Sequence, residues 1–348
     1  MKKIAILSGT LSRGGAERVS VYLSDKLRDF GISTVLITMK IAPKEYVLPD
    51  GVKRANVETN RNFVFGLRKL LKVEKPDALL IMGSSNASYA IPASLGLGIK
   101  TIVSERNSPA NFAGRKLTKL ISNSFIKFAD GYVFQTEDAK QYYKKMLGSR
   151  GVVIANPLFT DGLPSPFIGE RDNRIVSVGR LVDQKNHKML IDSFSIVSKK
   201  YPFLKLEIYG DGPNKSALLS YIKSLNLQDK ITLMGNVSDL FDKIKKAFCF
   251  VLSSNFEGMP NALIEAMAIG IPCISTNCPC GGPKTLINNG INGLLVDVDN
   301  SQMLANSIAY LIENKEQAKA IGNEGIKVRE TLNADLIVSK WFSYIDNL

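Results

Sequence analysis

The sequence predicts an α/β protein in which two doubly wound parallel domains follow one another along the chain. Its 348 residues exceed the roughly 100–200 residues of one ordinary domain. Short β-branched runs alternate with stretches of helical periodicity through both halves, which is typical of parallel sheets. The densest run of Pro, Gly and Ser lies at 155–166, where we expect the linker. The predicted domains are therefore 1–156 and 157–332.

The expected strands are short apolar runs that end at turns. In the first half they are 3–7, 34–38, 78–82, 101–104 and 131–135, with helical stretches such as 16–29 and 115–128 between them. In the second half they are 174–179, 205–209, 231–234, 248–252, 272–275 and 293–296. Ligands of open parallel sheets bind beyond the carboxyl ends of the strands. The turns after the strands are therefore the expected sites of function.

Composition excludes several classes of protein. No apolar run approaches the ~20 residues that span a bilayer, and the apolar start at 4–7 ends at Ser8-Gly9 without the context of a signal-peptide cleavage site. His187 is the single histidine, so multi-histidine zinc centres are excluded; we expect it to cap or pack. The four cysteines, at 249, 273, 278 and 280, lack the spacing of a disulfide framework or of a usual zinc site. This pattern favours a reducing cytoplasm and no bound metal.

Charge is divided unevenly between the two halves. Residues 1–156 contain 25 Lys and Arg against 12 Asp and Glu, whereas residues 157–348 contain 20 of each. The whole formal excess of +13 therefore belongs to the first half. This indicates an anionic partner there, such as a membrane surface, a phosphorylated acceptor or nucleic acid; the alternative is that net charge serves solubility.

The turn after the first strand carries two glycines, Gly14 and Gly15, before a helix with an apolar face. Glycine permits close backbone approach, and the free N–H groups of a helix start favour an anion. The turn has neither a Walker A pattern nor the three-glycine spacing of a dinucleotide fingerprint. It therefore predicts a phosphate or sugar contact, with a merely tight turn as the alternative.

The turn after strand 174–179 carries Arg180 and Lys185. An arginine and a lysine on one turn are able to converge on a diphosphate, where the guanidinium binds two oxygens and the ammonium supplies a point charge. Taken alone, this segment would by default be interpreted as two solvated surface cations.

The turn after strand 248–252 carries two carboxylates, Glu257 in the loop and Glu265 on the second turn of the helix that follows. Pro260 suits the first helical position. Between the carboxylates, the N–H groups of 258–261 form a helix start that attracts phosphate, and a carboxylate that accepts two sugar hydroxyls is ordinary ribose chemistry. The alternative for Glu265 is a structural helix charge.

These turns, taken together, resemble a known enzyme family. The blocks Gly14–Arg18, Gly179-Arg180 with 184–186, 210–213, and Glu257-x7-Glu265 followed by 270–275 look like a retaining family 4 glycosyltransferase of the GT-B fold. The resemblance covers nearly the whole chain in the right order. It implies two Rossmann-like domains that face each other across a cleft, with a nucleotide sugar held mainly by 157–332 and an acceptor by 1–156. The C-terminal helix at 333–348 would pack back onto the first domain.

The resemblance also implies a role for each matching residue. Arg180 and Lys185 would grip the donor diphosphate, Glu257 would contact the donor sugar near the reacting carbon, and Glu265 would take the ribose hydroxyls. The two cations would replace a divalent metal in stabilising the leaving group, so no metal or other cofactor is expected. The remaining donor-site positions are Gly14, Gly15, Gly179, Gly210, Asn236, Val237, Gly258, Met259, Pro260 and Asn261.

The sequence departs from the family pattern after strand 101–104. Many members carry a histidine there, whereas this chain reads Ser104-Glu105-Arg106-Asn107. Glu105 or Arg106 would take that place near the sugar hydroxyls. With Lys116 and Lys119, they are the candidate acceptor residues.

Helix 115–128 places apolar residues on one face and basic residues elsewhere. The apolar face would either cover the sheet or lie on a membrane, where each cation contributes ~1 kcal/mol at an anionic leaflet. We therefore expect the protein to attach to the inner face of the cytoplasmic membrane. We also expect a monomer or a weak dimer. Its acceptor would be a polyprenyl-diphosphate-linked glycan of O-antigen, capsule or a related polysaccharide. The resemblance implies a UDP-hexose or UDP-N-acetylhexosamine as its donor.

Two other functions remain open at this stage. One is an epimerase or hydrolase of nucleotide sugars on the same fold. The other is a nucleic-acid-binding protein, indicated by the pI of about 9.4 and the basic first half. Because no nucleic-acid-binding module is recognised, we do not expect nucleic acid as a partner.

Overall fold

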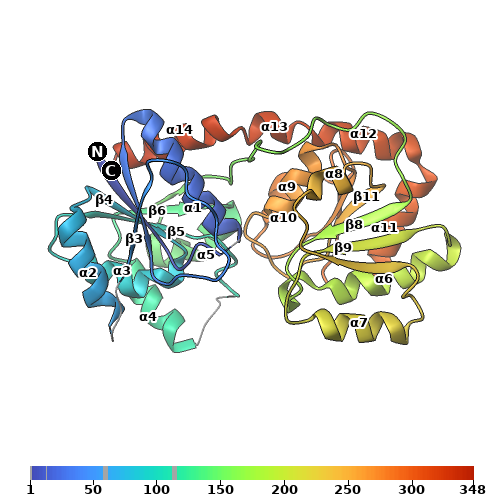
Figure 1. Ribbon diagram of the computed structural model, residues 1–348, viewed down its shortest axis with the longest axis horizontal. Helices are drawn as coiled ribbons and strands as arrows, with labels where there is room; N and C mark the ends of the chain where they lie inside the picture. Colours follow the sequence, from blue (N-terminus) through green and yellow to red (C-terminus); the bar gives the residue numbers. More distant parts are fainter. Residues whose placement is uncertain (1, 13, 58–61, 112–115) are drawn as a thin grey trace. The chain divides into compact units, whose positions relative to one another are not determined.

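The computed structural model describes residues 2–12, 14–57, 62–111 and 116–348, without the side chains of 116–118. The chain divides into two compact units (Figure 1). Unit 1 comprises residues 1–157 and 334–348, and unit 2 comprises residues 158–333. These boundaries lie one residue beyond those expected from the sequence.

In its described residues, unit 1 contains a seven-stranded parallel sheet in the order β3-β2-β1-β4-β5-β6-β7. The strands are β1 (Lys3–Ser8), β2 (Ser33–Thr38), β3 (Lys53–Asn56), β4 (Ala78–Met82), β5 (Lys100–Ser104), β6 (Gly131–Phe134) and β7 (Val152–Val153). The chain builds outward from β1 on one side and from β4 on the other, so strand order reverses where β1 pairs with β4. Ligands of doubly wound sheets bind beside such a reversal.

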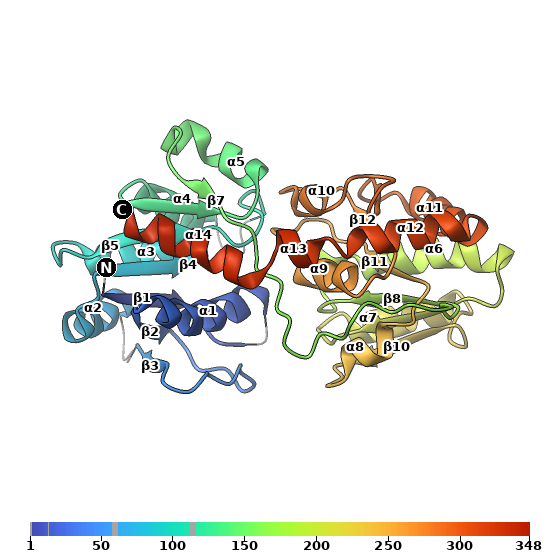
Figure 2. The same ribbon diagram turned by 90° about the horizontal axis from the view of Figure 1, so that it is seen from above.

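Helices flank the unit 1 sheet (Figures 1 and 2). They are α1 (Gly15–Lys26), α2 (Phe63–Glu74), α3 (Ala87–Ser94), α4 (Lys116–Ile126), α5 (Glu137–Leu147) and α14 (Ala334–Asp346). α2, α3 and α4 pack side by side as one layer. Short 3-10 turns lie at Leu27–Phe30 and Ser84–Asn86.

The central strand β1 shows why these residues form a parallel sheet. Its residues Ile4, Ala5, Ile6 and Leu7 are fully buried. Helices cover both faces of the sheet, so the strand has no solvent-facing positions at which polar residues would alternate with apolar ones. Burial of each Ile or Leu side chain contributes about 1.5–3 kcal/mol.

In unit 2 the described residues form a six-stranded parallel sheet in the order β10-β9-β8-β11-β12-β13. The strands are β8 (Arg174–Val178), β9 (Lys205–Tyr209), β10 (Ile231–Gly235), β11 (Cys249–Leu252), β12 (Cys273–Thr276) and β13 (Leu294–Val296). The helices are α6 (His187–Lys200), α7 (Lys215–Ser224), α8 (Leu240–Ile244), α9 (Asn261–Ala268), α10 (Gly282–Leu286), α11 (Ser301–Glu313), α12 (Lys315–Gly325) and α13 (Val328–Thr331). A further 3-10 turn lies at Asp183–Lys185.

The C-terminal helix α14 belongs to unit 1, so both chain ends lie in that unit (Figures 1 and 2). Trp341 is fully buried, and the ring of Phe342 stacks on that of Phe30 at 4.8 Å between centroids. The backbone N–H of Tyr132 donates to the hydroxyl of Tyr344 at 2.8 Å. These contacts fix α14 against β6 and the 3-10 turn at Leu27–Phe30.

The apolar side chains of α4 do not all cover the sheet. Leu120 is 65% exposed and Phe128, just beyond the helix, is 70% exposed, whereas Ile126 is buried. The expectation that the apolar face of this helix covers the sheet is therefore wrong for Leu120 and Phe128. Residue 115, the predicted start of this helix, lies outside the described residues. No helix in the described part of the chain is both long and apolar enough to span a membrane.

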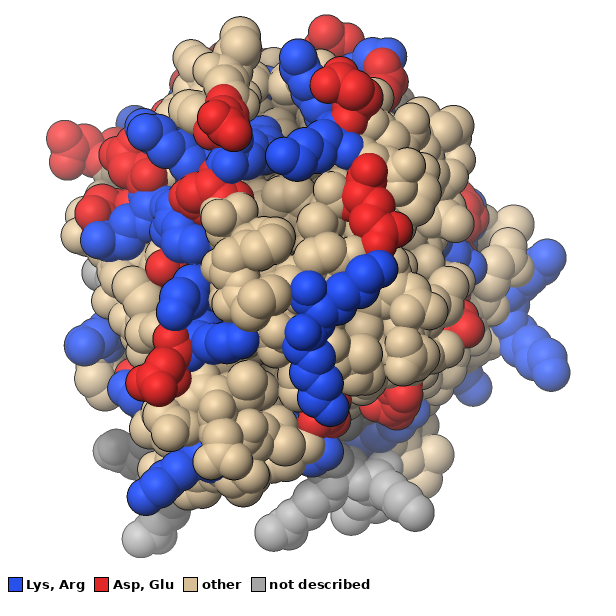
Figure 3. Space-filling model, turned by 90° about the vertical axis from the view of Figure 1, so that its right-hand side faces the viewer, with Lys and Arg blue, Asp and Glu red and all other residues tan. Residues whose placement is uncertain are grey.

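The surface of unit 2 carries both signs of charge in close alternation. Figure 3 shows one face on which lysines and arginines lie among carboxylates, with residues of other types between them. The equal numbers of basic and acidic residues in the second half agree with this mixture.

Candidate active site

The carboxyl ends of β8, β9 and β10 are brought together by glycines. Gly210 has a φ of +130°, and a Cβ atom there would lie 2.1 Å from the carbonyl oxygen of Gly179. The N–H of Gly210 donates to the carbonyl oxygen of Gly235 at 2.8 Å. Only glycine allows backbones to approach this closely. Of the predicted donor positions beyond β10, Asn236 is exposed and Val237 is partly exposed.

The turn after β8 places its two cations differently. Arg180 is exposed, whereas Lys185 is partly buried, with 16% of its side chain exposed. The Nζ atom of Lys185 lies 2.5 Å from Oε1 of Glu257. The interpretation of Lys185 as a solvated surface cation is therefore wrong, because it forms an ion pair with a buried carboxylate.

Glu257 is held by further donors. The hydroxyl of Ser254 donates to Oε1 at 2.7 Å, and Nε2 of Gln184 lies 3.4 Å from Oε2. The carboxylate is 6% exposed. Three donors therefore position one buried carboxylate after β11, and two of them, Ser254 and Gln184, were not expected to contact it.

The loops after β8 and β11 are joined along their length. Asn255 donates its backbone N–H to Gln184 at 2.8 Å, and Ser253 donates its hydroxyl to the carbonyl oxygen of Lys185 at 2.9 Å. Asn186, with a φ of +44°, caps α6 through Met189 and donates to the side chain of Asn255 at 2.8 Å. Lys185 thus sits on a rigid turn rather than a loose loop.

A third loop, before α10, packs against the Glu257 loop. The N–H of Glu257 donates to Pro279 at 2.8 Å, and the N–H of Cys280 donates back to Glu257 at 3.2 Å. A Cβ atom on Gly282 would lie 1.6 Å from the carbonyl oxygen of Gly258. The closeness of these two backbones requires glycine at 282.

The helix after the Glu257 loop carries the second predicted carboxylate. α9 begins at Asn261, with Pro260 as its N-cap, so Pro260 stands one position earlier than expected. Glu265 is on the second turn, as expected, and is 8% exposed. Met259 and Pro260 are also buried.

His187 lies next to the site but does not contribute a charge. Burial, together with the nearby charge of Lys185, lowers its pKa to about 4, so the imidazole is neutral at pH 7. It is the first residue of α6 and is buried, as expected for a packing residue.

In unit 1, Gly14 is the N-cap of α1, with extended backbone and no side-chain cap, and Gly15 is the first helical residue.

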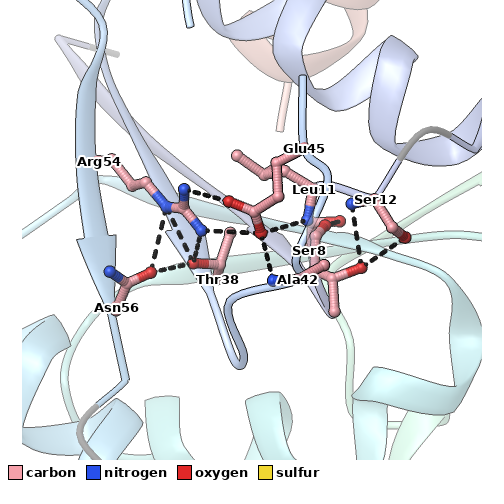
Figure 4. A network of polar contacts seen from close by, with 9 residues as sticks. Ser8, Leu11, Ser12, Thr38, Ala42, Glu45, Arg54 and Asn56 are labelled. Atoms are coloured by element: carbon pink, nitrogen blue, oxygen red, sulfur yellow. Dashed lines mark hydrogen bonds and ion pairs between the residues drawn. The ribbon is translucent and has the colours of Figure 1, made fainter. Parts of the chain in front are cut away.

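The turn before α1 is fixed by Glu45 (Figure 4). Its carboxylate accepts from the N–H of Ala42 at 2.8 Å and pairs with Arg54 at 2.6 Å. Hydrogen bonding to Arg54 holds the pKa of Glu45 below its usual range.

The remaining acceptor candidates are dispersed. Glu105 is buried at the end of β5, with Arg106 beside it. The ammonium of Lys119 lies 5.6 Å from the ring centroid of Tyr142. The side chain of Lys116 lies outside the described residues.

The described residues contain no cluster of three or more His, Cys, Asp or Glu side chains placed to hold a metal ion. The four cysteines are free and buried. A cavity of about 330 Å³ in unit 2 lies at the opposite, amino edge of the sheet. Its lining includes Phe203, Phe248 and Lys319, and no predicted site residue lines it.

Two Rossmann-like units, with basic and acidic residues on the turns that follow the strands, define a protein of the GT-B glycosyltransferase fold. Residues 13–161 match the family described as Glycosyltransferase Family 4, and residues 163–328 match the one described as Glycosyl transferases group 1. The chain belongs to the family 4 glycosyltransferases.

Similar proteins extend over the whole chain. An uncharacterised glycosyltransferase of Haemophilus influenzae is 27% identical over 98% of this chain and 99% of its own length. An α-1,4-N-acetyl-D-galactosaminyltransferase of Campylobacter jejuni, named for an undecaprenyl-diphosphate-linked substrate, is 27% identical over 99% of this chain and 98% of its own. The crystal structure of HepE from Anabaena in complex with UDP has a TM-score of 0.83, with 18% identity over the full length of both chains.

Proposed function

We propose that this chain is a retaining, metal-independent hexosyltransferase that moves a hexose or N-acetylhexosamine from a UDP-sugar to a polyprenyl-diphosphate-linked glycan. The product would enter O-antigen, capsule or a related polysaccharide. The observation that carries the proposal is the Lys185–Glu257 pair, held on rigid turns at the carboxyl edge of the unit 2 sheet. The Campylobacter relative's lipid-linked substrate and the UDP in HepE support the substrate classes.

In this proposal the cations act on the leaving group. Departure of UDP places negative charge on its β-phosphate, and Lys185 and Arg180 stabilise that charge in place of a metal. Glu257 orients the sugar beside the reacting carbon, and Glu265 accepts the ribose hydroxyls. Unit 2 would thus bind the donor, and unit 1 the acceptor.

A donor screen tests this proposal. UDP- and GDP-sugars are incubated with a polyprenyl-diphosphate-linked acceptor, with and without a chelator, and the anomeric configuration of the product is assigned by NMR. We expect transfer from a UDP-sugar with retention and without loss in the chelator. Free sugar or an epimer in place of a glycoside, or tighter binding of single-stranded DNA than of UDP, would contradict it.

The variant Arg180→Ala tests whether Arg180 stabilises the leaving group. Because Arg180 is exposed, we expect its loss to leave the melting temperature unchanged while transfer falls at least tenfold. The control is Lys188→Ala, which removes another exposed cation from the neighbouring helix.

We further propose that unit 1 binds the inner face of the cytoplasmic membrane through α2 and α4. The exposed apolar side chains on or just beyond these two helices are Phe65, Val73, Leu120, Ile121 and Phe128. Between residues 62 and 129 the chain has ten basic residues and three acidic ones, and two of the acidic ones, Glu74 and Glu105, are buried. Apolar side chains among cations suit an anionic lipid surface.

Liposome flotation at low salt tests the membrane proposal. We expect the protein to float with vesicles that contain phosphatidylglycerol and to stay in solution with neutral vesicles. The double variant Leu120→Ser with Phe128→Ser should reduce flotation, whereas Ile291→Ser, an exposed apolar residue of unit 2, should not. Equal flotation of both variants would overturn the assignment to α4.

A further inference from the structure

Unpartnered polar atoms gather in one short segment of unit 1. Among the described residues, only a few buried side-chain nitrogen or oxygen atoms lack a hydrogen-bond partner. Most of these unpartnered atoms belong to three residues, one at the end of β5 and two shortly after it. They are the hydroxyls of Ser104 and Ser108 and the Nε and Nη1 atoms of Arg106. Buried polar groups are almost always paired, so such a concentration indicates a missing ligand.

The guanidinium of Arg106 is held in place by one nitrogen only. Its Nη2 donates to Oδ1 of Asn156, which also accepts from Nε2 of Gln135 at 2.6 Å. Burial lowers the pKa of Arg106 to about 10, so it remains charged at pH 7. The other two nitrogens are oriented but have no acceptor.

The charges of the neighbouring carboxylates act on Arg106, but neither supplies an acceptor to its Nε or Nη1 atom. Glu105 accepts from Ser84 at 2.5 Å, from Tyr143 at 2.9 Å and from the N–H groups of Arg106 and Asn107, so its oxygens are occupied. The second carboxylate whose charge acts on Arg106 is Glu17, in the first turn of α1. The segment therefore lies close to the start of α1, at the ligand-binding edge of the sheet.

We propose that Arg106 binds a phosphate oxygen of a substrate diphosphate, with the hydroxyls of Ser104 and Ser108 as additional donors. The guanidinium offers donors only, carries a full charge and is held before the ligand arrives, which suits an oxyanion better than a sugar hydroxyl. This inference rests on the proposed function and deepens it. The diphosphate belongs either to the nucleotide donor or to the lipid-linked acceptor.

Calorimetric titration of the full chain with two probes separates these sources. UDP represents the donor, and farnesyl diphosphate represents the acceptor's lipid diphosphate. Arg106→Met should weaken one of the two about tenfold to a hundredfold, as expected for loss of a charge-assisted contact, and Arg106→Lys should retain part of the affinity. The probe that is weakened identifies the source.

Thermal unfolding distinguishes a ligand-binding role from a structural one. The buried Nε and Nη1 atoms of Arg106 have no hydrogen-bond partner, and their desolvation cost offsets the charge that Arg106 supplies beside Glu105, so Arg106→Met should melt close to the wild type. Asn156 keeps Gln135 as a donor in this variant. The control, Lys145→Gln, removes an exposed charge of unit 1 and should change neither affinity nor melting temperature.

The inference is overturned if both affinities of Arg106→Met stay within twofold of the wild type, or if this variant and Arg106→Lys both melt at clearly lower temperature. Its failure differs from failure of the proposed function. If the wild type transfers sugar to the lipid-linked acceptor and the variants do so with unchanged KM, only the Arg106 assignment fails. If the wild type neither binds UDP nor transfers sugar, the proposed function itself fails.

Discussion

Lys185 and Glu257 form an ion pair with 2.5 Å between Nζ and Oε1, although 72 residues separate them in the sequence. Sequence reasoning assigned the lysine to a diphosphate and the glutamate to a sugar. The structure adds that each holds the other in position. A donor that binds here would meet a lysine already oriented by a carboxylate, so reorganisation during the reaction is small.

Replacement of Lys185 tests whether the pair serves stability as well as activity. Lys185→Met leaves the Glu257 carboxylate buried without its cation, so we expect a loss of about 1–3 kcal/mol in unfolding free energy and a fall in transfer rate on the order of 100-fold. The double variant Lys185→Met with Glu257→Gln should regain most of the stability but none of the activity. Chemical denaturation and initial rates measure the two effects. Recovery of transfer in the double variant would contradict the role of Lys185.

Replacement of Glu265 tests the nucleotide-binding assignment. Glu265→Gln keeps the shape of a buried side chain but removes the charge that would accept two ribose hydroxyls. We expect UDP affinity to fall about tenfold or more, measured by calorimetric titration. Glu316→Gln, on an exposed position of α12, is the control. Unchanged UDP affinity would leave Glu265 with a purely structural role.

Gly282→Ala tests the close packing of two loops. The added methyl group would lie 1.6 Å from the carbonyl oxygen of Gly258, so one backbone must move. We expect a loss of about 1–3 kcal/mol in stability together with reduced transfer, because Glu257 is bonded to the same loop. Gly325→Ala, where the new atom meets only ordinary contacts from 3.6 Å, should melt like the wild type. Similar melting temperatures for the two variants would argue against the contact.

His187 should make stability depend on pH. Its folded pKa of about 4 lies below the value of about 6.5 for an exposed histidine, so the unfolded chain binds a proton first as pH falls. The stability that His187 provides is therefore full above pH 6.5 and is lost as pH falls towards 4, with a loss of about 2 kcal/mol by pH 5. Denaturant unfolding at pH 7 and pH 5 measures this. In His187→Leu that part of the pH dependence should disappear, and an equal decline in both proteins would refute it.

Buried strands were predictable because their signal is local. β4 and β9 occur at the predicted residues, since β4 is uniformly apolar, β9 alternates polar and apolar residues, and both end at turns. β3 was missed because Lys53–Asn56 is a polar edge strand, and β7 because it has only two residues. An edge strand is defined by its neighbour and not by its own pattern.

The location of the candidate site residues could be predicted, but the contacts between them could not. Gly179, Lys185, Glu257 and Glu265 follow strands, and parallel strands bring their carboxyl ends to one edge. Nothing in the sequence indicates that Gln184 and Ser254 hold Glu257, since hydrogen bonds between distant loops have no periodic signal.

The sequence alone predicts most of the strands, the two-domain α/β fold and the family, because these signals come from residues close together in the chain. Only the tertiary structure decided that Lys185 is paired, that Leu120 and Phe128 are exposed, and that Arg106 has nitrogens without acceptors. Burial and pairing depend on which distant segments meet, and that is settled by packing of the whole fold.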